Sequence, residues 1–187
     1  MTERPIIFNG EMVRAILDGR KTQTRRVIKP QPPEWASSID SSTPKMGFVK
    51  FHGGSYNQQK EYGIPTCPYG KPGDRLWVRE AVSRVRRPSG EWMYRADYPV
   101  DIASAYKWNP SIHMRRDQSR ITLEITDVRV ERVQDISADD AKAEGIHILR
   151  QRDYGFKRVW DSINAKRGYG WDKNPWVWVV EFRRVDQ

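Results

Sequence analysis

The sequence has almost none of the residues that build disulfides or metal sites. Cys67 is the only cysteine, and the three histidines, His52, His113 and His147, lie far apart. A single thiol cannot form an internal disulfide or hold a structural zinc ion without several other ligands. The histidines also lack a ligand spacing such as HExxH. We therefore expect no metal and no cofactor.

Long apolar runs are missing as well. No segment approaches the ~18–20 apolar residues that a membrane-spanning helix needs. The N-terminus, MTERPIIFNG, contains only a short apolar stretch, Pro5 to Phe8, which polar residues follow at once. It therefore lacks the apolar core of a signal peptide. These absences predict a cytoplasmic protein that does not enter a membrane.

Acidic residues are fewer than basic ones. The chain has 24 Asp and Glu against 33 Lys and Arg, a formal net charge of +9. Such an excess indicates a polyanionic partner, most often nucleic acid, but a basic protein without one has the same composition. The eight tryptophans can stack on unpaired bases when arginines lie between them, although most tryptophans in a small domain belong to the core.

Periodic segments predict a mixed α and β chain. A short helix is expected at 11–17, with Asn9 as its N-cap and Gly19 as the residue that ends it. Two further helices are expected in SADDAKAEG, with Ser137 as N-cap, and in DYGFKRVWDSINAK. Strands are expected at 22–28 and in RLWVRE, EWMYRADY, ITLEITDVRVERV and PWVWVVEFRRV. The strand ITLEITDVRVERV changes face at Asp127, which predicts a bulge or a barrel corner.

The length of the chain fits one domain. We therefore expect residues 1–187 to form a single α+β domain, with a mostly antiparallel sheet that can close on itself. Residues 31–66 differ from the rest, because their first half is rich in Pro and Ser without periodicity. This segment is predicted to be a long, loop-rich insertion, with GFVKFHGG as a hairpin arm inside it.

The segment DGRKTQTRR, from Asp18 to Arg26, follows the first predicted helix. It holds four basic residues, two threonines and no apolar side chain. A solvated turn that complements the helix dipole would have this composition. A patch that binds phosphate groups, or a catalytic loop, would have it too.

Four stretches together give the chain a resemblance to a known family. They are GRKTQTRR after the first helix, KPGDRLWVRE, ITLEITDVRVERV before SADDAKAEGI, and the closing PWVWVVEFRRV. With these motifs the chain resembles the ASCH-domain family, and its sequence looks most similar to those of members encoded by bacteriophages and prophages. The resemblance implies a PUA-like, mostly antiparallel β-barrel with short flanking helices. The insertion at 31–66 has no counterpart in the small members of the family.

The resemblance also implies a function. The family binds RNA or nucleosides in a cleft between barrel and helices, and its small bacterial members include amidohydrolases that deacetylate N4-acetylcytidine. Those enzymes use a lysine and a threonine from this segment and a glutamate from a later strand. The matching residues here are Lys21 and Thr24, with Glu124 as the glutamate and Glu80 as its competitor.

The chemistry sets conditions on these residues. The hydroxyl of Thr24 is a weak nucleophile without an adjacent base. Lys21 can act as that base only if burial or nearby cations lower its pKa from ~10.4. In an extended strand the two side chains would point to opposite faces, so an irregular backbone must bring them together. The helix exit at Gly19 makes such a backbone plausible.

Other residues are candidates for binding the ligand. Arg20, Arg25 and Arg26 can hold an anionic ligand or lower the pKa of the lysine. Three residues of the second stretch, Trp77, Arg79 and Glu80, can line the cleft, although a surface ion pair is the simpler interpretation for Arg79 and Glu80. The loop 166–176, KRGYGWDKNPW, is a weaker candidate for a wall against which a base stacks.

The leading hypothesis is hydrolysis of the amide of N4-acetylcytidine or a similar modified pyrimidine nucleoside, with a nucleoside or RNA as ligand. The alternative is an RNA-binding module without catalysis, in a regulatory role in a phage or prophage. A ribonuclease is less favoured, because no cluster of metal ligands is visible. If the chain is phage-encoded, its location is the cytoplasm of the bacterial host.

Overall fold

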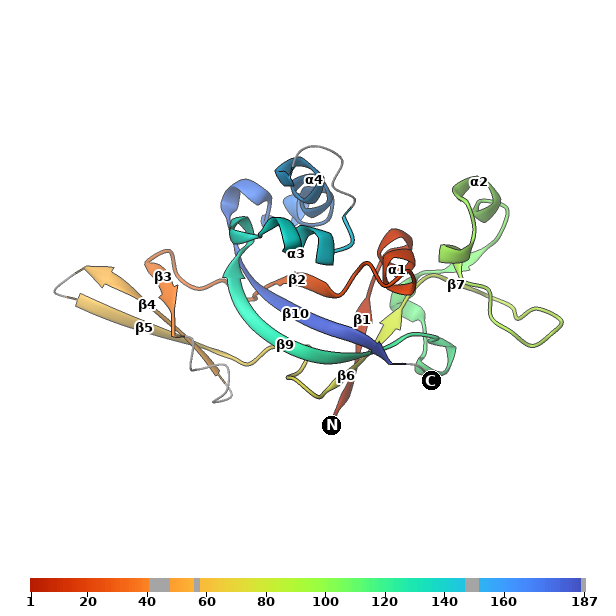
Figure 1. The fold of residues 1–187 in the computed structure, drawn as a ribbon, viewed down its shortest axis with the longest axis horizontal. Coiled ribbons are helices and arrows are strands. Elements are labelled where there is room, and N and C mark those ends of the chain that lie inside the picture. Colours follow the sequence, from red (N-terminus) through yellow and green to blue (C-terminus); the bar gives the residue numbers. More distant parts are fainter. Residues whose placement is uncertain (41–47, 56–57, 147–151, 186–187) are drawn as a thin grey trace.

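The computed structural model describes residues 1–40, 48–55, 58–146 and 152–185. Its centre is a curved five-stranded sheet in the order β1–β6–β9–β10–β2 (Figure 1). β1 runs parallel to β6, and all other neighbours in this sheet are antiparallel. The five strands are β1 Glu3–Ile7, β2 Gln23–Val27, β6 Arg75–Arg79, β9 Thr122–Arg132 and β10 Trp176–Val185.

The sheet is open, in contrast to the barrel that the sequence predicts. Its edge strands β1 and β2 are fully described and share no backbone pairing. A side chain connects them instead, because the Arg26 Nη2 atom donates a hydrogen bond to the Ile7 carbonyl oxygen at 2.6 Å. The edges therefore approach each other without closing.

The long strands β9 and β10 explain how the sheet curves. Leu123 and Ile125 of β9 are buried, as their alternation predicts. Ile125 pairs with Phe182, but Asp127 pairs with Glu181, so that Thr126 is one extra residue in β9. This irregularity confirms the bulge predicted at Asp127, and a bulge of this kind bends the strand that contains it.

The predicted helices are present. Two of them, α1 (Gly10–Leu17) and α3 (Ala138–Ala143), begin at the predicted caps, where the side chains of Asn9 and Ser137 accept hydrogen bonds from backbone N–H groups. Gly19 has a φ of 72°, which glycine adopts without strain, and it ends the first of these helices. The longest helix is α4, Arg152–Asn164. Each described helix is too short or too polar to cross a membrane.

The predicted loop-rich insertion contains a second sheet. Strands β3 (Ala36–Ile39), β4 (Phe48–Ser55) and β5 (Gln58–Pro65) form an antiparallel arm that reaches away from the main sheet (Figure 1). Val49 and Phe51 alternate on β4 and pack in the same hydrophobic cluster as Ile64 of β5. The Phe51 ring lies 5.1 Å from that of Trp176, between centroids, so the base of the arm joins the main core.

One predicted strand, EWMYRADY, is wrong. In this stretch Tyr94 makes only an isolated bridge, and Arg95–Asp97 is a turn of 3-10 helix. Side chains stabilise it instead, since the Arg120 guanidinium lies 4.0 Å from the centroid of the Tyr94 ring and pairs with Asp97. Three short elements lie before and after this stretch in the sequence: β7 Val82–Ser83, α2 Val100–Ala103 and β8 Trp108–Asn109.

Candidate functional site

Lys21 is buried rather than solvated. Its residue surface is 2% exposed, although it lies in the most polar segment of the chain. Its Nζ atom donates hydrogen bonds to the carbonyl oxygens of Gln23 at 2.8 Å and Glu144 at 2.9 Å. A third goes to the Glu144 Oε2 atom at 2.7 Å. An ammonium group has three protons, so each has an acceptor. This geometry excludes the solvated turn as an account of Lys21.

The backbone of this segment is irregular, as the chemistry requires. Lys21 pairs with Glu144 in an isolated bridge, and the Thr22 N–H group donates to the Ala143 carbonyl oxygen. The lysine side chain also reaches the carbonyl oxygen of Gln23, two residues further along the chain. Its ammonium group therefore contacts the peptide group that precedes Thr24.

The surroundings of Lys21 change its acidity. Burial lowers the pKa of the ammonium group below its ordinary value, and the nearby carboxylate of Glu144 acts in the opposite direction. The positive charges of Arg26 and Arg25 lower the pKa of Lys21 further. The net direction is the one that a general base needs.

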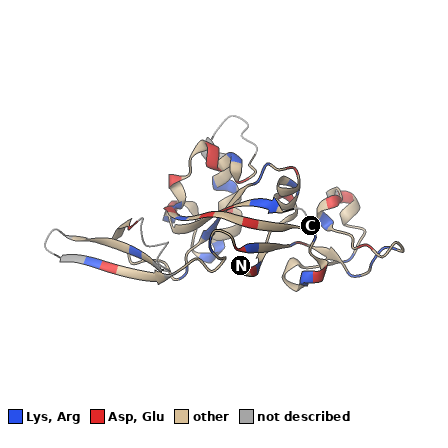
Figure 2. Cartoon of the chain, turned by 60° about the horizontal axis from the view of Figure 1, so that its bottom comes forward, with Lys and Arg blue, Asp and Glu red and all other residues tan. Residues whose placement is uncertain are grey.

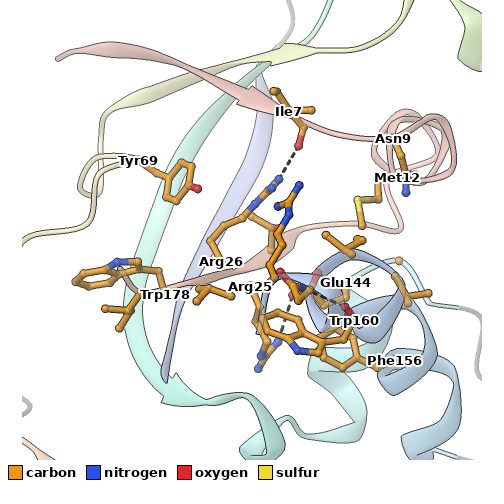
Figure 3. Close-up of a pocket in the computed structure, with 18 of the residues that line it drawn as sticks. Ile7, Asn9, Met12, Arg25, Arg26, Tyr69, Glu144, Phe156, Trp160 and Trp178 are labelled. Atoms are coloured by element: carbon orange, nitrogen blue, oxygen red, sulfur yellow. Dashed lines mark hydrogen bonds and ion pairs between the residues drawn. The ribbon is translucent and has the colours of Figure 1, made fainter. Parts of the chain in front are cut away.

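Thr24 and Glu144 both line a pocket of about 780 Å³ (Figure 3). It lies between edge strand β2, the end of β1, the start of α1 and helix α4. Its size is within the range of small-molecule sites. Much of its wall is apolar or aromatic, including Met12, Tyr69, Phe156, Trp160 and Trp178. Lys21 does not line the pocket, whereas its ion-pair partner Glu144 does.

Arg25 also lines this pocket, but its charge is already balanced. Its guanidinium group is 2.9 Å from Glu131, 3.2 Å from Asp140 and 3.4 Å from Glu144. Because the Arg25 side chain is 1% exposed, these carboxylates are its main source of stabilisation. Arg25 pairs with the Oε1 atom of Glu144, whereas Lys21 pairs with the Oε2 atom.

Asp140 in this cluster predicts how stability depends on pH. Burial raises its pKa, but hydrogen bonds from Gln23 and Ser137 outweigh that effect and lower the pKa of Asp140 to about 2. A carboxylate with a lowered folded-state pKa stabilises the fold above its unfolded value of ~3.9, and the contribution is lost as the pH falls to about 2. We expect wild type to have a higher free energy of unfolding than Asp140→Asn. This difference should be largest above pH 4 and should shrink as the pH falls toward 2. Urea unfolding across this range measures it, and a constant difference would contradict it.

The carboxylate predicted for the site is corrected by the structure. Glu124 lies on β9 and pairs with Arg183 at 3.0 Å, away from Lys21 and outside the lining of the pocket. The competitor Glu80 pairs with Arg120 at 2.9 Å. Burial raises the pKa of Glu80, and its carboxylate borders a different, smaller hollow. Neither is the partner of Lys21, which is Glu144.

The other predicted binding residues divide into two groups. Arg25 and Arg26 line the pocket, as does Arg167 from the loop 166–176. Arg20 is exposed and pairs with Asp18 at 2.8 Å. Arg79 and Trp77 lie outside the lining of this pocket. Arg79 donates a hydrogen bond to the Met114 carbonyl oxygen, and its guanidinium group lies 5.1 Å from the centroid of the Trp77 ring.

The sequence holds one signal for Glu144. Glu144 is the C-cap of α3, directly before Gly145. A carboxylate at the C-terminal end of a helix opposes the helix dipole, so it is unfavourable unless another group compensates it. Lys21 and Arg25 are those groups.

The net charge of the chain did not help to locate the pocket. Lys and Arg positions are spread over the arm, the central sheet and the helices, with Asp and Glu positions between them (Figure 2). Within the part of the chain that the structure describes, no group of three or more His, Cys, Asp or Glu residues is arranged to hold a metal ion.

Comparison with known proteins finds two solved structures at low sequence identity, each with a TM-score below 0.5. No family model and no curated protein matches the chain. A crystal structure of a protein from Enterococcus faecalis V583, described by the family model DUF984, is 12% identical, with a TM-score of 0.47, and the match covers 100% of this chain and 81% of that one. The ASCH domain from Lactobacillus crispatus JV V101 is 11% identical, with a TM-score of 0.42, over 98% of this chain and 79% of that one.

Proposed function

We propose that the chain binds a modified pyrimidine nucleoside, free or within RNA, in this pocket and hydrolyses an amide on its base. N4-acetylcytidine is the most concrete substrate. One observation carries the proposal: Thr24 and Glu144 line one pocket, and the buried Lys21 pairs with the Glu144 carboxylate at 2.7 Å. The resemblance of GRKTQTRR to the ASCH amidohydrolases supports the same assignment of Lys21 and Thr24.

In the proposed reaction the Thr24 oxygen attacks the acyl carbon, and its proton passes to the Lys21–Glu144 pair. The C–N bond then breaks, and the pair returns the proton to the nitrogen that leaves as the amine of cytidine. Water hydrolyses the acetyl ester of Thr24, which releases acetate and restores the hydroxyl group. Because Glu144 lines the pocket and Lys21 does not, Glu144 is the residue that exchanges protons with the substrate, and Lys21 sets its charge.

Cytidine release from N4-acetylcytidine tests the reaction. We expect Glu144→Gln to lower the rate by roughly 10²–10⁴-fold, the usual contribution of a general acid or base. Glu124→Gln is the matched control, because that carboxylate pairs with Arg183 outside the pocket lining, and its rate should stay within about twofold of wild type. If wild type releases no cytidine, this substrate is wrong. If both variants lose activity equally, the role of Glu144 is wrong.

A second pair of variants separates chemistry from folding. Thr24→Val removes the hydroxyl group at nearly the same volume, and Thr24→Ser keeps it. We expect only the serine variant to retain measurable release, since a nucleophile needs the hydroxyl oxygen. Equal activity in the two variants would show that Thr24 does not form a bond to the acyl group.

A binding module without catalysis is the second candidate, and one observation favours it. All three protons of the Lys21 ammonium group have acceptors, an arrangement that stabilises the charged form rather than a free base. This candidate predicts that wild type binds N4-acetylcytidine in calorimetry and leaves it intact. On the family resemblance we also propose that either function is carried out in a bacterial cytoplasm, and that the chain comes from a phage or prophage.

A further inference from the structure

Arg26 lines the pocket without an ion-pair partner among the described residues. Its guanidinium group lies over the Phe8 ring, 5.1 Å from the centroid, and 5.9 Å from that of Tyr69. Its Nη2 atom donates to the Ile7 carbonyl oxygen, whereas its buried Nε atom has no acceptor. Among the described residues no carboxylate lies within ion-pair distance of Arg26, in contrast to the three that surround Arg25.

Two further cations line the same pocket. Arg167 comes from the turn after α4, and Lys29 follows β2 with its Nζ atom 5.1 Å from the centroid of the Tyr169 ring. Neither has an ion-pair partner within the described part of the chain. The carboxylates that line the pocket are Glu144, which Lys21 and Arg25 hold, and Glu11, on the exposed first turn of α1.

The pocket therefore has three cations without an ion-pair partner among the described residues, of which Arg26 is half-buried and Lys29 and Arg167 are exposed. Burial lowers the pKa of Arg26, Tyr69 and Glu144 act in the opposite direction, and repulsion by the positive charge of Arg167 lowers it. An arginine stays protonated despite such shifts, so the repulsion is not relieved by loss of a proton. A bound anion would relieve it, and a guanidinium group with unused N–H groups matches the oxygens of a phosphate.

We propose that this pocket binds a phosphate group of its ligand at Arg26, with Arg167 and Lys29 beside it. The ligand is then a nucleotide, or a nucleotide unit of an RNA chain, rather than a neutral nucleoside. The inference rests on the proposed function for the nucleoside part of the ligand, while the phosphate part follows from the cations alone. Arg25 is not part of this subsite, because three carboxylates already occupy it.

Calorimetric titration of wild type with cytidine, cytidine 5′-monophosphate and a cytidine-containing dinucleotide tests the proposal. We expect at least one phosphorylated ligand to bind about tenfold or more tightly than cytidine, the scale of a charge-assisted contact. Tighter binding of the monophosphate identifies a terminal phosphate, and tighter binding of the dinucleotide identifies a phosphodiester. Arg26→Gln should reduce this advantage to about twofold or less. The control Arg183→Gln changes an arginine that pairs with Glu124 outside the pocket lining and should leave the advantage unchanged.

The outcomes separate the two proposals. Equal affinity for cytidine and its phosphates overturns the phosphate subsite and leaves the proposed function intact. Inorganic phosphate that binds wild type but not Arg26→Gln, together with no binding of cytidine or its N4-acetyl form, supports the subsite and contradicts the proposed function. If Arg26→Gln still binds the phosphorylated ligand more tightly than cytidine by the same factor as wild type, Arg26 does not bind the phosphate.

Discussion

The variant Lys21→Met should unfold at a temperature roughly 6–20 °C below that of wild type. The buried ammonium group balances the carboxylate of Glu144 and satisfies two buried carbonyl oxygens. Breaking a buried ion pair by removing one partner costs ~3–5 kcal/mol. In a domain of this size each kcal/mol lowers the melting temperature by roughly 2–4 °C. A thermal melt followed by circular dichroism measures the difference.

Two further variants show whether the effect comes from the unpaired carboxylate. Lys21→Met combined with Glu144→Leu should recover most of the loss, because an apolar pair of similar volume often replaces a buried ion pair at little cost. Lys142→Met is the surface control, since its lysine pairs with Asp139 at the exposed surface of α3. Its melting temperature should change by no more than about 4 °C. If the melting temperature of Lys21→Met also lies within about 4 °C of wild type, the structural role of the lysine is contradicted.

The variant Gly145→Ala should lose roughly 2–5 kcal/mol of stability and weaken the pocket. Gly145 has a φ of 82°, and a methyl group there would lie 2.8 Å from the Ala15 Cβ atom and 3.1 Å from that of Lys21. The left-handed backbone costs an alanine ~1–2 kcal/mol, and the overpacking adds ~1–3 kcal/mol. The clash pushes on Lys21, so ligand affinity should fall together with the free energy of unfolding in urea.

Gly168 supplies a matched control for this effect. Its φ is 83°, but a Cβ atom there would meet nothing within 4 Å. Gly168→Ala should therefore lose only the backbone cost of ~1–2 kcal/mol. The two variants differ in steric contact alone, and equal losses would show that Gly145 is not packed against α1 and Lys21 as the structure has it.

The local elements of the fold could be predicted because short-range chemistry determines them. Asn9, Gly19 and Ser137 cap or end their helices by contacts within a few residues, and such contacts are visible in sequence. The alternation of Leu123 and Ile125 likewise gave β9 its buried face. The open sheet could not be predicted in this way, because whether β1 pairs with β2 depends on how strongly β9 and β10 bend.

The candidate site was predictable in its basic half only. Lys21, Thr24 and Arg26 lie in one distinctive segment, so the sequence placed them together. Glu144 comes from the far end of α3, and no periodicity connects it with Lys21. Glu124 was chosen because an alternating strand exposes a carboxylate at a regular position, but that position faces Arg183. The predicted hairpin arm GFVKFHGG corresponds to β4, but its partner strands β3 and β5 were not predicted, because the Pro- and Ser-rich first half of the insertion indicated loops.

The pairing of β2 also determines when the pocket can form during synthesis. In the described part of the chain β2 has β10 as its only strand partner, with Gln23 opposite Glu181 and Val27 opposite Val177. A contact between residues so far apart must pay for closing a long loop, and such contacts form slowly. On a ribosome the segment with Lys21 and Thr24 emerges early and stays without this partner until β10 has followed. A nascent chain therefore should not form the pocket before β10 has been made, and a chain interrupted before β10 should never acquire it.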